Sequence, residues 1–300
     1  MRSPVPLRRR LAPGILAGPL VIFACVLGTS GCASALREPR PIADLAGEVR
    51  PKPGGDGPDS GAPAATPADV PAILGRAEAL YAERGPGERA LESVRMAARE
   101  FLRAAAADGT RTDGLVGAAR ARVWLADHEA DPAARQASAG SAVEAAQWCG
   151  RIAPLDRECD YWFGAALGVQ ARERPSTALN ALPKIEAAFK RAADALPALD
   201  EAGPERALAL LYVRAPGWPA GPGNPDLGLK HARAAVALRP DYPPNQLALA
   251  EALAATGGRE AADVPRRLAL ELARKLAAGD PDAPEWIAEA EADLERTGPK

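Results

Sequence analysis

The feature that most constrains the fold is a helical periodicity that runs through three quarters of the chain. From residue 69 to residue 296 the sequence is rich in Ala, Leu, Glu and Arg and poor in β-branched residues. Ile73, Ala77 and Leu80 fall on one face of a helix, and the apolar residues of 286–294 have the same spacing. No segment has the alternation of a convincing strand. The sequence therefore predicts an all-α domain over residues 69–300.

A weak internal repeat organises the expected helices. Similar Ala-rich helix ends that lead into a proline recur in three segments, 146–154, 191–197 and 233–240. Their spacing of about 43 residues lies within the 40 to 47 of long helical hairpins and above the 34 of a tetratricopeptide unit. Residues 229–253 nevertheless fit a tetratricopeptide register, with Ala235, Pro240 and Ala250 at the small-residue and turn positions. We expect five stacked antiparallel hairpins in a tetratricopeptide-like α-solenoid, with a compact helical bundle as the alternative.

Helix starts are marked by a capping side chain followed by proline. Asp131 precedes Pro132 and Asn224 precedes Pro225. Asp and Asn can accept a hydrogen bond from the first turn, and proline lacks only an N–H that has no partner there. Both pairs predict that a helix begins at the proline.

The first 31 residues have the three parts of an export signal. Four arginines precede an apolar run, and small residues lead up to Cys32. Residues 26–32 resemble the bacterial lipobox, in which signal peptidase II cuts before a lipid-modified cysteine, although Thr29 stands where Leu is commonest. We expect a lipoprotein signal peptide at 1–31 and lipidation of Cys32. An ordinary cleaved signal and an uncleaved transmembrane anchor are the alternatives, and Pro19 is among the residues that break the apolar run.

Residues 33–68 are dominated by Pro, Gly, Asp and Ala. Such a composition buries too little apolar surface to offset the entropy lost on ordering. We expect residues 32–68 to comprise the lipidated cysteine and a disordered tether. As a flexible coil the tether would span roughly 30 to 35 Å.

The charge of the exported chain excludes one class of partner. Loss of the signal removes four of the 37 basic residues and none of the 39 acidic ones, so the formal charge changes from −2 to −6. No basic surplus remains to hold nucleic acid.

The residue after Cys32 bears on the location of the protein. Position 33 is Ala, whereas many lipoproteins that are retained at the inner membrane have Asp at this position. We therefore expect a periplasmic protein that is anchored by lipid, with the outer membrane favoured.

Two cysteines remain in the expected folded part. Cys25 leaves with the signal and Cys32 is expected to carry lipid, which leaves Cys149 and Cys159, ten residues apart across a helix–helix turn. In an oxidising periplasm such a pair can form a disulfide. A reduced pair in the core is the alternative.

Groups that could carry out catalysis are scarce. His128 and His231 are the only histidines, and neither belongs to a metal-binding pair with i, i+4 spacing. Residues 221–226 lack the third glycine of a dinucleotide loop, and the carboxylates stand among arginines at helical spacing, as on a solvated face. We expect no enzyme activity, cofactor or metal, and an envelope enzyme is kept only as a third reading.

Unusual residues instead gather in the middle repeats. Residues 161–163 are Tyr-Trp-Phe, and consecutive positions spread over about 200° of a helix, so these rings cannot all face one core. Later segments add a helical Arg and Tyr, a Trp in a Pro-rich loop and an Asn at a helix start. A pocket with aromatic walls and a few orienting polar groups is the functional hypothesis, and the alternative makes the tryptophans core and loop plugs. The candidate ligand-binding residues are Tyr161, Trp162, Arg206, Tyr212, Trp218 and Asn245.

At these segments the chain resembles the T component (TatT) of tripartite ATP-independent periplasmic (TRAP) transporters. The resemblance covers roughly residues 140–255. Three departures are Ala202 and Ala209, where the family tends to have Gly, and Gln246, which replaces His. The matching residues are Tyr161, Trp162, Leu167, Gly168, Gly203, Pro204, Arg206, Leu208, Leu211, Tyr212, Pro216, Gly217, Trp218, Pro240, Tyr242, Asn245, Leu249, Ala250 and Glu251.

The resemblance implies a periplasmic lipoprotein of tetratricopeptide-like helices that associates with the solute-binding protein of a secondary transporter. It also implies that the two exchange an apolar or organic-acid ligand. The alternative function is a general tetratricopeptide scaffold for envelope proteins with no small-molecule ligand. A ligand site requires a closed aromatic pocket within residues 161–245, whereas a scaffold requires an open groove of polar side chains. Assembly with further copies of the chain also stays open.

Overall fold

The computed structural model describes residues 36–47 and 65–297. The chain divides into two units, 1–32 and 33–300, and all described residues belong to the second. The expected signal peptide and Cys32 lie outside the described residues. Within the described ranges the fold contains helices and no strand, apart from a single bridge between Gly217 and Gly223, which confirms the predicted all-α class. No helix found in these ranges is long and apolar enough to span a bilayer.

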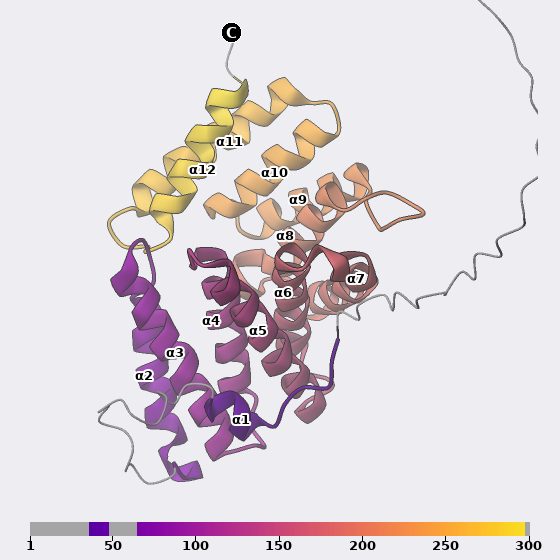
Figure 1. Cartoon of the computed structure of the whole chain (residues 1–300). Helices are drawn as coiled ribbons and strands as arrows, with labels where there is room; N and C mark the ends of the chain where they lie inside the picture. The colour runs from indigo at the N-terminus through magenta and orange to yellow at the C-terminus, as the bar shows by residue number, and fades with distance from the viewer. Residues whose placement is uncertain (1–35, 48–64, 298–300) are drawn as a thin grey trace, which may run out of the picture. The chain divides into compact units, whose positions relative to one another are not determined.

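The helices pair into successive hairpins (Figure 1). The leading helices of the hairpins begin 40 to 44 residues apart, in agreement with the repeat length predicted from the sequence. Because the helices are up to 21 residues long, each hairpin exceeds a tetratricopeptide unit. The elements are α1 Ile42–Gly47, η1 Pro67–Asp69, α2 Val70–Ala82, α3 Glu88–Ala107, α4 Asp113–His128, α5 Pro132–Ile152, α6 Arg157–Glu173, η2 Pro175–Thr177, α7 Ala178–Ala195, α8 Leu199–Arg214, α9 Pro225–Leu238, α10 Pro243–Ala255, α11 Arg259–Leu276 and α12 Ala283–Thr297.

The helices form two layers. Each even-numbered helix from α2 to α12 contacts the next even-numbered helix, whereas within the described part α3, α5, α7, α9 and α11 do not contact one another. Stacked repeats converge on the side where their neighbouring helices touch. The even-numbered helices α2 to α12 are therefore called the inner layer. The odd-numbered helices α3 to α11 are called the outer layer.

Both helix starts predicted from a cap and a proline are confirmed. The side chain of Asp131 accepts a hydrogen bond from the backbone N–H of Ala134 at 3.1 Å, and α5 begins at Pro132. Asn224 accepts one from the N–H of Leu227 at 3.1 Å, directly before α9. These bonds satisfy donors of the first turn that have no partner within the helix.

Glycines inside the inner helices let large rings of the outer helices pack closely. A Cβ atom on Gly117 of α4 would lie 2.3 Å from Cδ1 of Phe101 in α3. A Cβ atom on Gly164 of α6 would lie 2.6 Å from Cε1 of Phe189 in α7. Both rings are buried, so the same kind of contact joins the consecutive hairpins at α3 and α4 and the two helices of the hairpin α6–α7.

We expect Gly164→Ala to destabilise the protein although alanine is the better helix former. The new methyl group must displace the buried Phe189 ring, and overpacking of this kind costs about 1 to 3 kcal/mol. Gly140 of α5 provides the matched control, because nothing lies within 4 Å of the position that a Cβ atom would take there. Gly140→Ala should raise the free energy of unfolding by up to about 1 kcal/mol. Urea unfolding measures both changes, and equal signs would contradict the close contact.

The expected disordered tether is wrong for part of its length. Residues 36–47, which we call the strap, lie against the domain through α1, and Leu45 is completely buried against α3. Leu36 and Ile42 also pack on the main core. The average composition of 33–68 concealed these three apolar residues, of which Ile42 and Leu45 lie on α1. Helical structure also starts at Pro67 instead of residue 69, and residues 48–64 lie outside the described ranges.

Candidate functional site

Three of the six predicted ligand-binding residues, Tyr161, Arg206 and Asn245, lie together where α6, α8 and α10 meet. Nη1 of Arg206 donates to Oδ1 of Asn245 and to the carbonyl oxygen of Glu201, each at 3.0 Å. Its Nη2 donates to the carbonyl and carboxylate oxygens of Asp200 at 3.3 and 3.1 Å. The Tyr161 hydroxyl donates to the same carboxylate. Both terminal nitrogens of Arg206 are thus occupied by acceptors of the chain itself.

The backbone beside this cluster is strained. Asp200, Glu201 and Ala202 have φ values of 49°, 53° and 64°, in the left-handed region that non-glycine residues rarely enter. Gly203 follows, and a Cβ atom there would lie 2.3 Å from the Tyr161 hydroxyl oxygen. Nδ2 of the buried Asn245 donates to the Glu201 carbonyl at 3.0 Å. Side chains of α8 and α10 therefore hold the turn in a conformation that the residues themselves disfavour.

The electrostatics of the cluster suit a structural role. Burial, and then the negative charge of Asp200, raises the pKa of Tyr161 well above its ordinary value, so its hydroxyl stays protonated. Burial opposes the charge of Arg206, but Tyr161 and Asp200 outweigh it and the pKa of the guanidinium is raised. The guanidinium also lies 5.2 Å from the centroid of the Tyr242 ring. At neutral pH the cluster offers a hydroxyl donor and a paired cation.

The other three candidates have different surroundings. Trp162 packs edge-on against Tyr161, with ring centroids 5.0 Å apart. The Tyr212 hydroxyl donates to Oε1 of Glu186 at 2.8 Å, and its ring stacks on His231. Trp218 is 91% exposed, in the loop between α8 and α9 that projects from the helices in Figure 1. The structure does not bring the six residues to one cavity within the described ranges.

We expect Trp218→Ala to leave stability almost unchanged, contrary to what a loop plug would give. The loop is held by backbone bonds, including the Asn224 N–H to the Tyr212 carbonyl at 2.8 Å and the Gly223 N–H to the Pro216 carbonyl at 2.9 Å. An exposed substitution of this kind changes the free energy of unfolding by about 0.5 kcal/mol or less. Thermal unfolding checks this, with truncation of the buried Trp286 as the positive control. A large drop in Tm for Trp218→Ala would contradict the exposed position.

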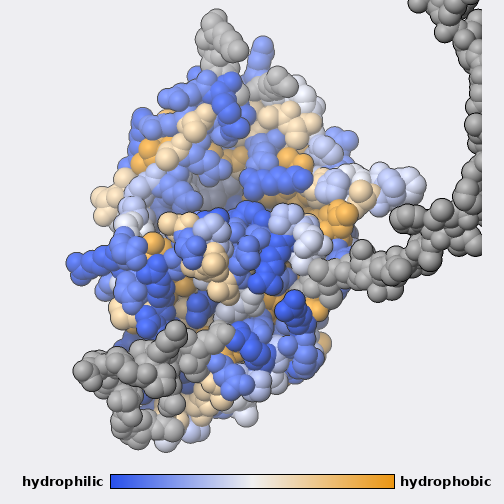
Figure 2. Space-filling view, viewed as in Figure 1, coloured by the Kyte–Doolittle hydropathy of each residue, from blue (hydrophilic) through white to orange (hydrophobic). Residues whose placement is uncertain are grey.

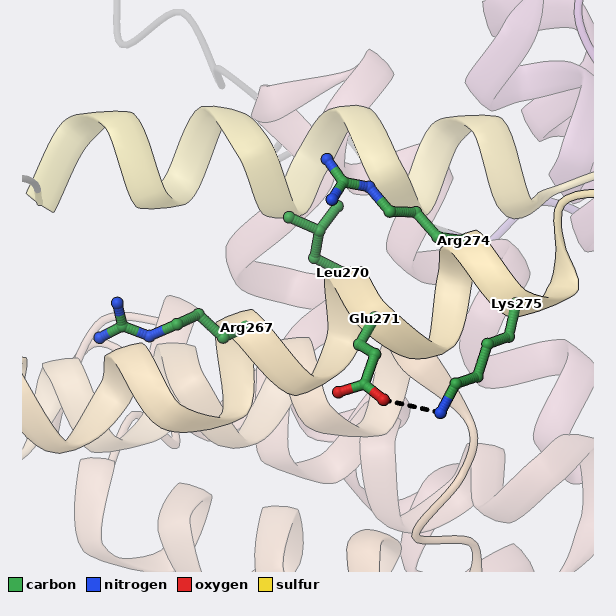
Figure 3. Close-up of a pocket in the computed structure, with 5 residues that line it drawn as sticks. All are labelled: Arg267, Leu270, Glu271, Arg274 and Lys275. Atoms are coloured by element: carbon green, nitrogen blue, oxygen red, sulfur yellow. Dashed lines mark hydrogen bonds and ion pairs between the residues drawn. The ribbon is translucent and has the colours of Figure 1, made fainter.

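A surface hollow of about 490 Å³ lies on α11, in the outer layer, and none of the six candidates lines it (Figure 3). It is formed by Arg267, Leu270, Glu271, Arg274 and Lys275. Lys275 pairs with Glu271 at 2.7 Å, and Arg274 reaches Glu291 of α12 at the same distance. The hollow is a shallow charged surface that differs from the aromatic pocket predicted from the sequence.

The inner layer carries a set of charged side chains that sequence reasoning treated as an ordinary solvated face. Arg172 of α6 pairs with Asp127 of α4, and Arg214 of α8 pairs with Glu251 of α10 at 2.6 Å. Glu289 of α12 is electrostatically coupled to Arg214 and Glu251. Only the stacking of repeats brings these residues together. We call the set Asp127, Arg172, Arg214, Glu251, Glu285 and Glu289 the inner charged surface.

The inner charged surface is solvent-accessible and yet recessed. Burial raises the pKa of Asp127, and burial with the neighbouring Asp293 raises the pKa of Glu289. Nε2 of His128 lies 3.1 Å from Oε2 of Glu285, across 157 residues of sequence. Burial would lower the pKa of His128, but the contacts with Glu285 and a backbone carbonyl raise it. Helices as far apart in the sequence as α4 and α12 thus contribute to one polar surface.

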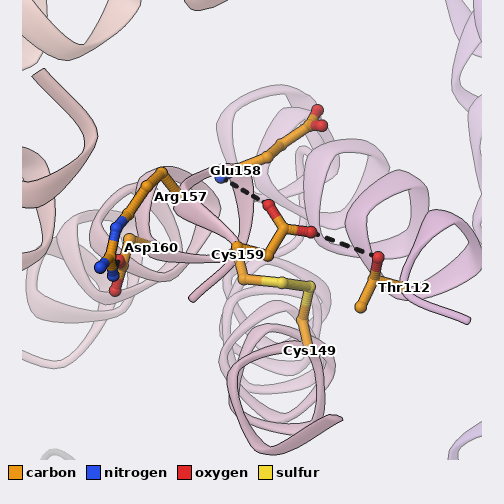
Figure 4. The surroundings of a disulfide bond; sticks show 7 residues. Thr112, Cys149, Arg157, Glu158, Cys159 and Asp160 are labelled. Atoms are coloured by element: carbon orange, nitrogen blue, oxygen red, sulfur yellow. Dashed lines mark hydrogen bonds and ion pairs between the residues drawn. A yellow bond between two sulfur atoms is a disulfide. The ribbon is translucent and has the colours of Figure 1, made fainter. Parts of the chain in front are cut away.

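Cys149 and Cys159 form a disulfide that joins α5 to α6 (Figure 4). Their Cα atoms are 5.5 Å apart, an ordinary separation for a disulfide, and both residues are buried. The bond crosses the turn that contains Pro154. In the described ranges no group of His, Cys, Asp and Glu is arranged to hold a metal ion.

Comparison with known proteins identifies the fold. No protein-family model matches the chain, and no curated protein matches it. Among solved structures, the chain is similar to a thermophilic TPR (tetratricopeptide-repeat) protein of Thermus thermophilus. The TM-score is 0.53 at 21% identity, over 74% of this chain and 99% of the other. A structure of MamA protein aligns with a TM-score of 0.41 at 15% identity, over 70% and 94% of the two chains. The first likeness confirms a tetratricopeptide-like fold.

Proposed function

We propose that the protein is a lipid-anchored periplasmic scaffold that binds a partner protein through the inner charged surface. The observation that carries the proposal is the arrangement of the residues that were predicted to line a pocket. Arg206 is occupied by Asp200 and Asn245, and Trp218 stands in solvent, so neither residue is placed to line the closed aromatic pocket that a small ligand would require. The inner layer instead presents an open, polar surface of the kind that a scaffold requires.

The chemistry of the inner charged surface favours a basic partner. It holds four carboxylates against two arginines, and Glu285 is 61% exposed. Complementary charge speeds encounter and suppresses wrong partners more than it adds affinity. On the face shown in Figure 2, hydrophilic side chains predominate and hydrophobic ones appear only in small groups. Electrostatic recognition therefore suits this protein better than a broad apolar interface.

The family resemblance supports the solute-binding protein of a TRAP-type transporter as the partner. Gly203, Arg206, Tyr242 and Asn245, which the chain shares with the T component, pack with Tyr161 in one cluster. The shared residues thus specify the junction of three inner helices. In this proposal an apolar or organic-acid ligand is held by the solute-binding protein, and the scaffold positions that protein at the membrane.

The anchor is part of the same proposal. The export signal and Cys32 support lipidation, and the disulfide is consistent with an oxidising compartment. Diacylation gives stable attachment where one chain gives only marginal binding. Cys32→Ala should abolish labelling by a fatty-acid probe in cells. Unchanged labelling of the variant would remove the anchor from the proposal.

Partner binding is tested by reversing charge on the two layers. Glu285→Lys should weaken binding of the purified solute-binding protein at least tenfold, and the loss should shrink at high salt. Glu271→Lys on α11 is the matched control, since the Glu271 side chain is 62% exposed and, like Glu285, pairs with a basic residue. Surface plasmon resonance measures both affinities. Equal affinities for the two variants would exclude the inner charged surface as the binding site, and absence of binding by the unmutated protein would exclude this partner.

A further inference from the structure

We propose that the strap holds the helical domain directly against the bilayer, with the end of α5 and the following turn facing the lipid. The inference rests on the proposed lipid at Cys32. It replaces the long flexible tether expected from composition with a short, fixed connection. The occupant of the strap-side surface is therefore the membrane itself.

The strap is fastened to α5 by specific contacts. Arg40 pairs with Glu144, with Nε 2.9 Å from Oε1, and Nε1 of Trp148 donates to the Arg40 carbonyl at 2.7 Å. Glu38 pairs with Arg151 at 2.7 Å. Further along, Leu45 is fully buried in the main core. These contacts combine a buried leucine, a partly buried indole hydrogen bond and two ion pairs, so the strap is a part of the folded domain.

Covalent geometry then limits the distance to the lipid. Leu36 is the first residue of the strap, and four peptide units separate it from Cys32. An extended chain spans at most about 3.6 Å per residue, so the two Cα atoms are at most about 14 Å apart. A diacylated cysteine sits at the interface between headgroups and acyl chains. The start of the strap must therefore lie close to the headgroup layer.

The contacts of the strap identify the surface that approaches the lipid. The Arg37 carbonyl accepts a bond from Gln147, and Glu38 pairs with Arg151, so the strap begins beside the last turns of α5. The turn that follows α5 carries Leu155, which is 82% exposed. An exposed leucine four residues after Arg151 fits the boundary between apolar chains and headgroups.

Site-specific quenching in proteoliposomes tests this placement. The full-length lipidated protein, with its native disulfide intact, receives one added cysteine, either Leu155→Cys or the control Val264→Cys on α11. Val264 is 69% exposed and lies in the last outer helix. Each cysteine carries a bimane fluorophore, and the quencher is a bilayer lipid brominated on its acyl chains. We expect at least twofold stronger quenching at position 155 than at position 264.

Release of the strap provides the second arm. Arg40→Glu should loosen the strap and reduce quenching at position 155, while the fatty-acid probe still labels Cys32. Arg40→Glu combined with Glu144→Arg should restore the quenching because the ion pair is reversed. Circular dichroism confirms that each variant is folded.

Each remaining outcome overturns the inference in a distinguishable way. Quenching could be equal at the two positions, or absent at position 155, in protein that carries the fatty-acid label. Either result would show that the domain is not held against the bilayer, although Cys32 is lipidated. Loss of the fatty-acid label from the unmutated protein would overturn both the anchor and the membrane contact.

Discussion

Arg206→Ala is expected to lower the free energy of unfolding by about 3 kcal/mol, the cost of removing one partner from a largely buried ion pair. The figure lies at the lower end of the usual range because solvent reaches Asp200. The substitution leaves Oδ1 of the fully buried Asn245 without its donor. It also removes the bonds to the carbonyls of Asp200 and Glu201. The left-handed turn then loses the contacts that offset its strain.

Arg214→Ala on the same helix is the matched control. Arg214 also pairs with a carboxylate, Glu251, but its side chain is 58% exposed. Solvent screens such a pair, and its loss should cost about 1 kcal/mol or less. Urea unfolding measures the free energies, and hydrogen exchange of residues 199–206 shows whether the turn opens first. An Arg206→Ala protein as stable as Arg214→Ala would mean that the cluster does not hold the turn, and Arg206 would again be a candidate for ligand binding.

The fold could be predicted because it depends on local patterns. Helical periodicity, the caps at Asp131 and Asn224 and the spacing of the turns each act within a few residues, and all three agree with one another. Because these local signals agree, a stacked helical array can be predicted from one sequence. The inner layer then follows from stacking without any further signal.

The arrangement of the candidate site could not be predicted, because it depends on contacts across long sequence separations. Nothing in the local sequence of Asp200, Glu201 and Ala202 indicates three left-handed residues, since none of them is glycine. The turn exists because Asn245, 44 residues away from Glu201, donates to its carbonyl. Trp218 shows the opposite case, in which a residue type that usually packs is left in solvent.

The strap was missed for a different reason. Composition was averaged over residues 33–68, and the average concealed three apolar side chains among the first 13 residues. One partner is Trp148 of α5, which bonds to Arg40 across 108 residues of sequence. A segment of low average hydropathy can therefore dock when a few apolar residues find a prepared surface.

Loss of the Cys149–Cys159 bond is expected to cost about 2 to 3 kcal/mol. The bond closes a loop of ten residues. On the chain-entropy model, such a cross-link lowers the entropy of the unfolded chain and so stabilises the folded state by that amount. The intact protein should take up no thiol reagent until it is reduced and unfolded, and then two equivalents. Uptake of two equivalents without prior reduction would show that the bond is absent.

A double substitution, Cys149→Ala with Cys159→Ala, removes the disulfide without adding a reductant, so it distinguishes loss of the bond from other effects of the reductant. It should unfold at the same urea concentration as the reduced unmutated protein, and added reductant should not change it further. The bond also lies among the residues that fasten the strap, because Gln147, Trp148 and Arg151 flank Cys149 on α5. Local opening at this end of α5 should therefore free the strap before the rest of the domain unfolds. The rate of hydrogen exchange of residues 36–47 should rise in the double variant, while the rate in α10 is little changed. Equal increases in both regions would show that the bond stabilises the domain only as a whole.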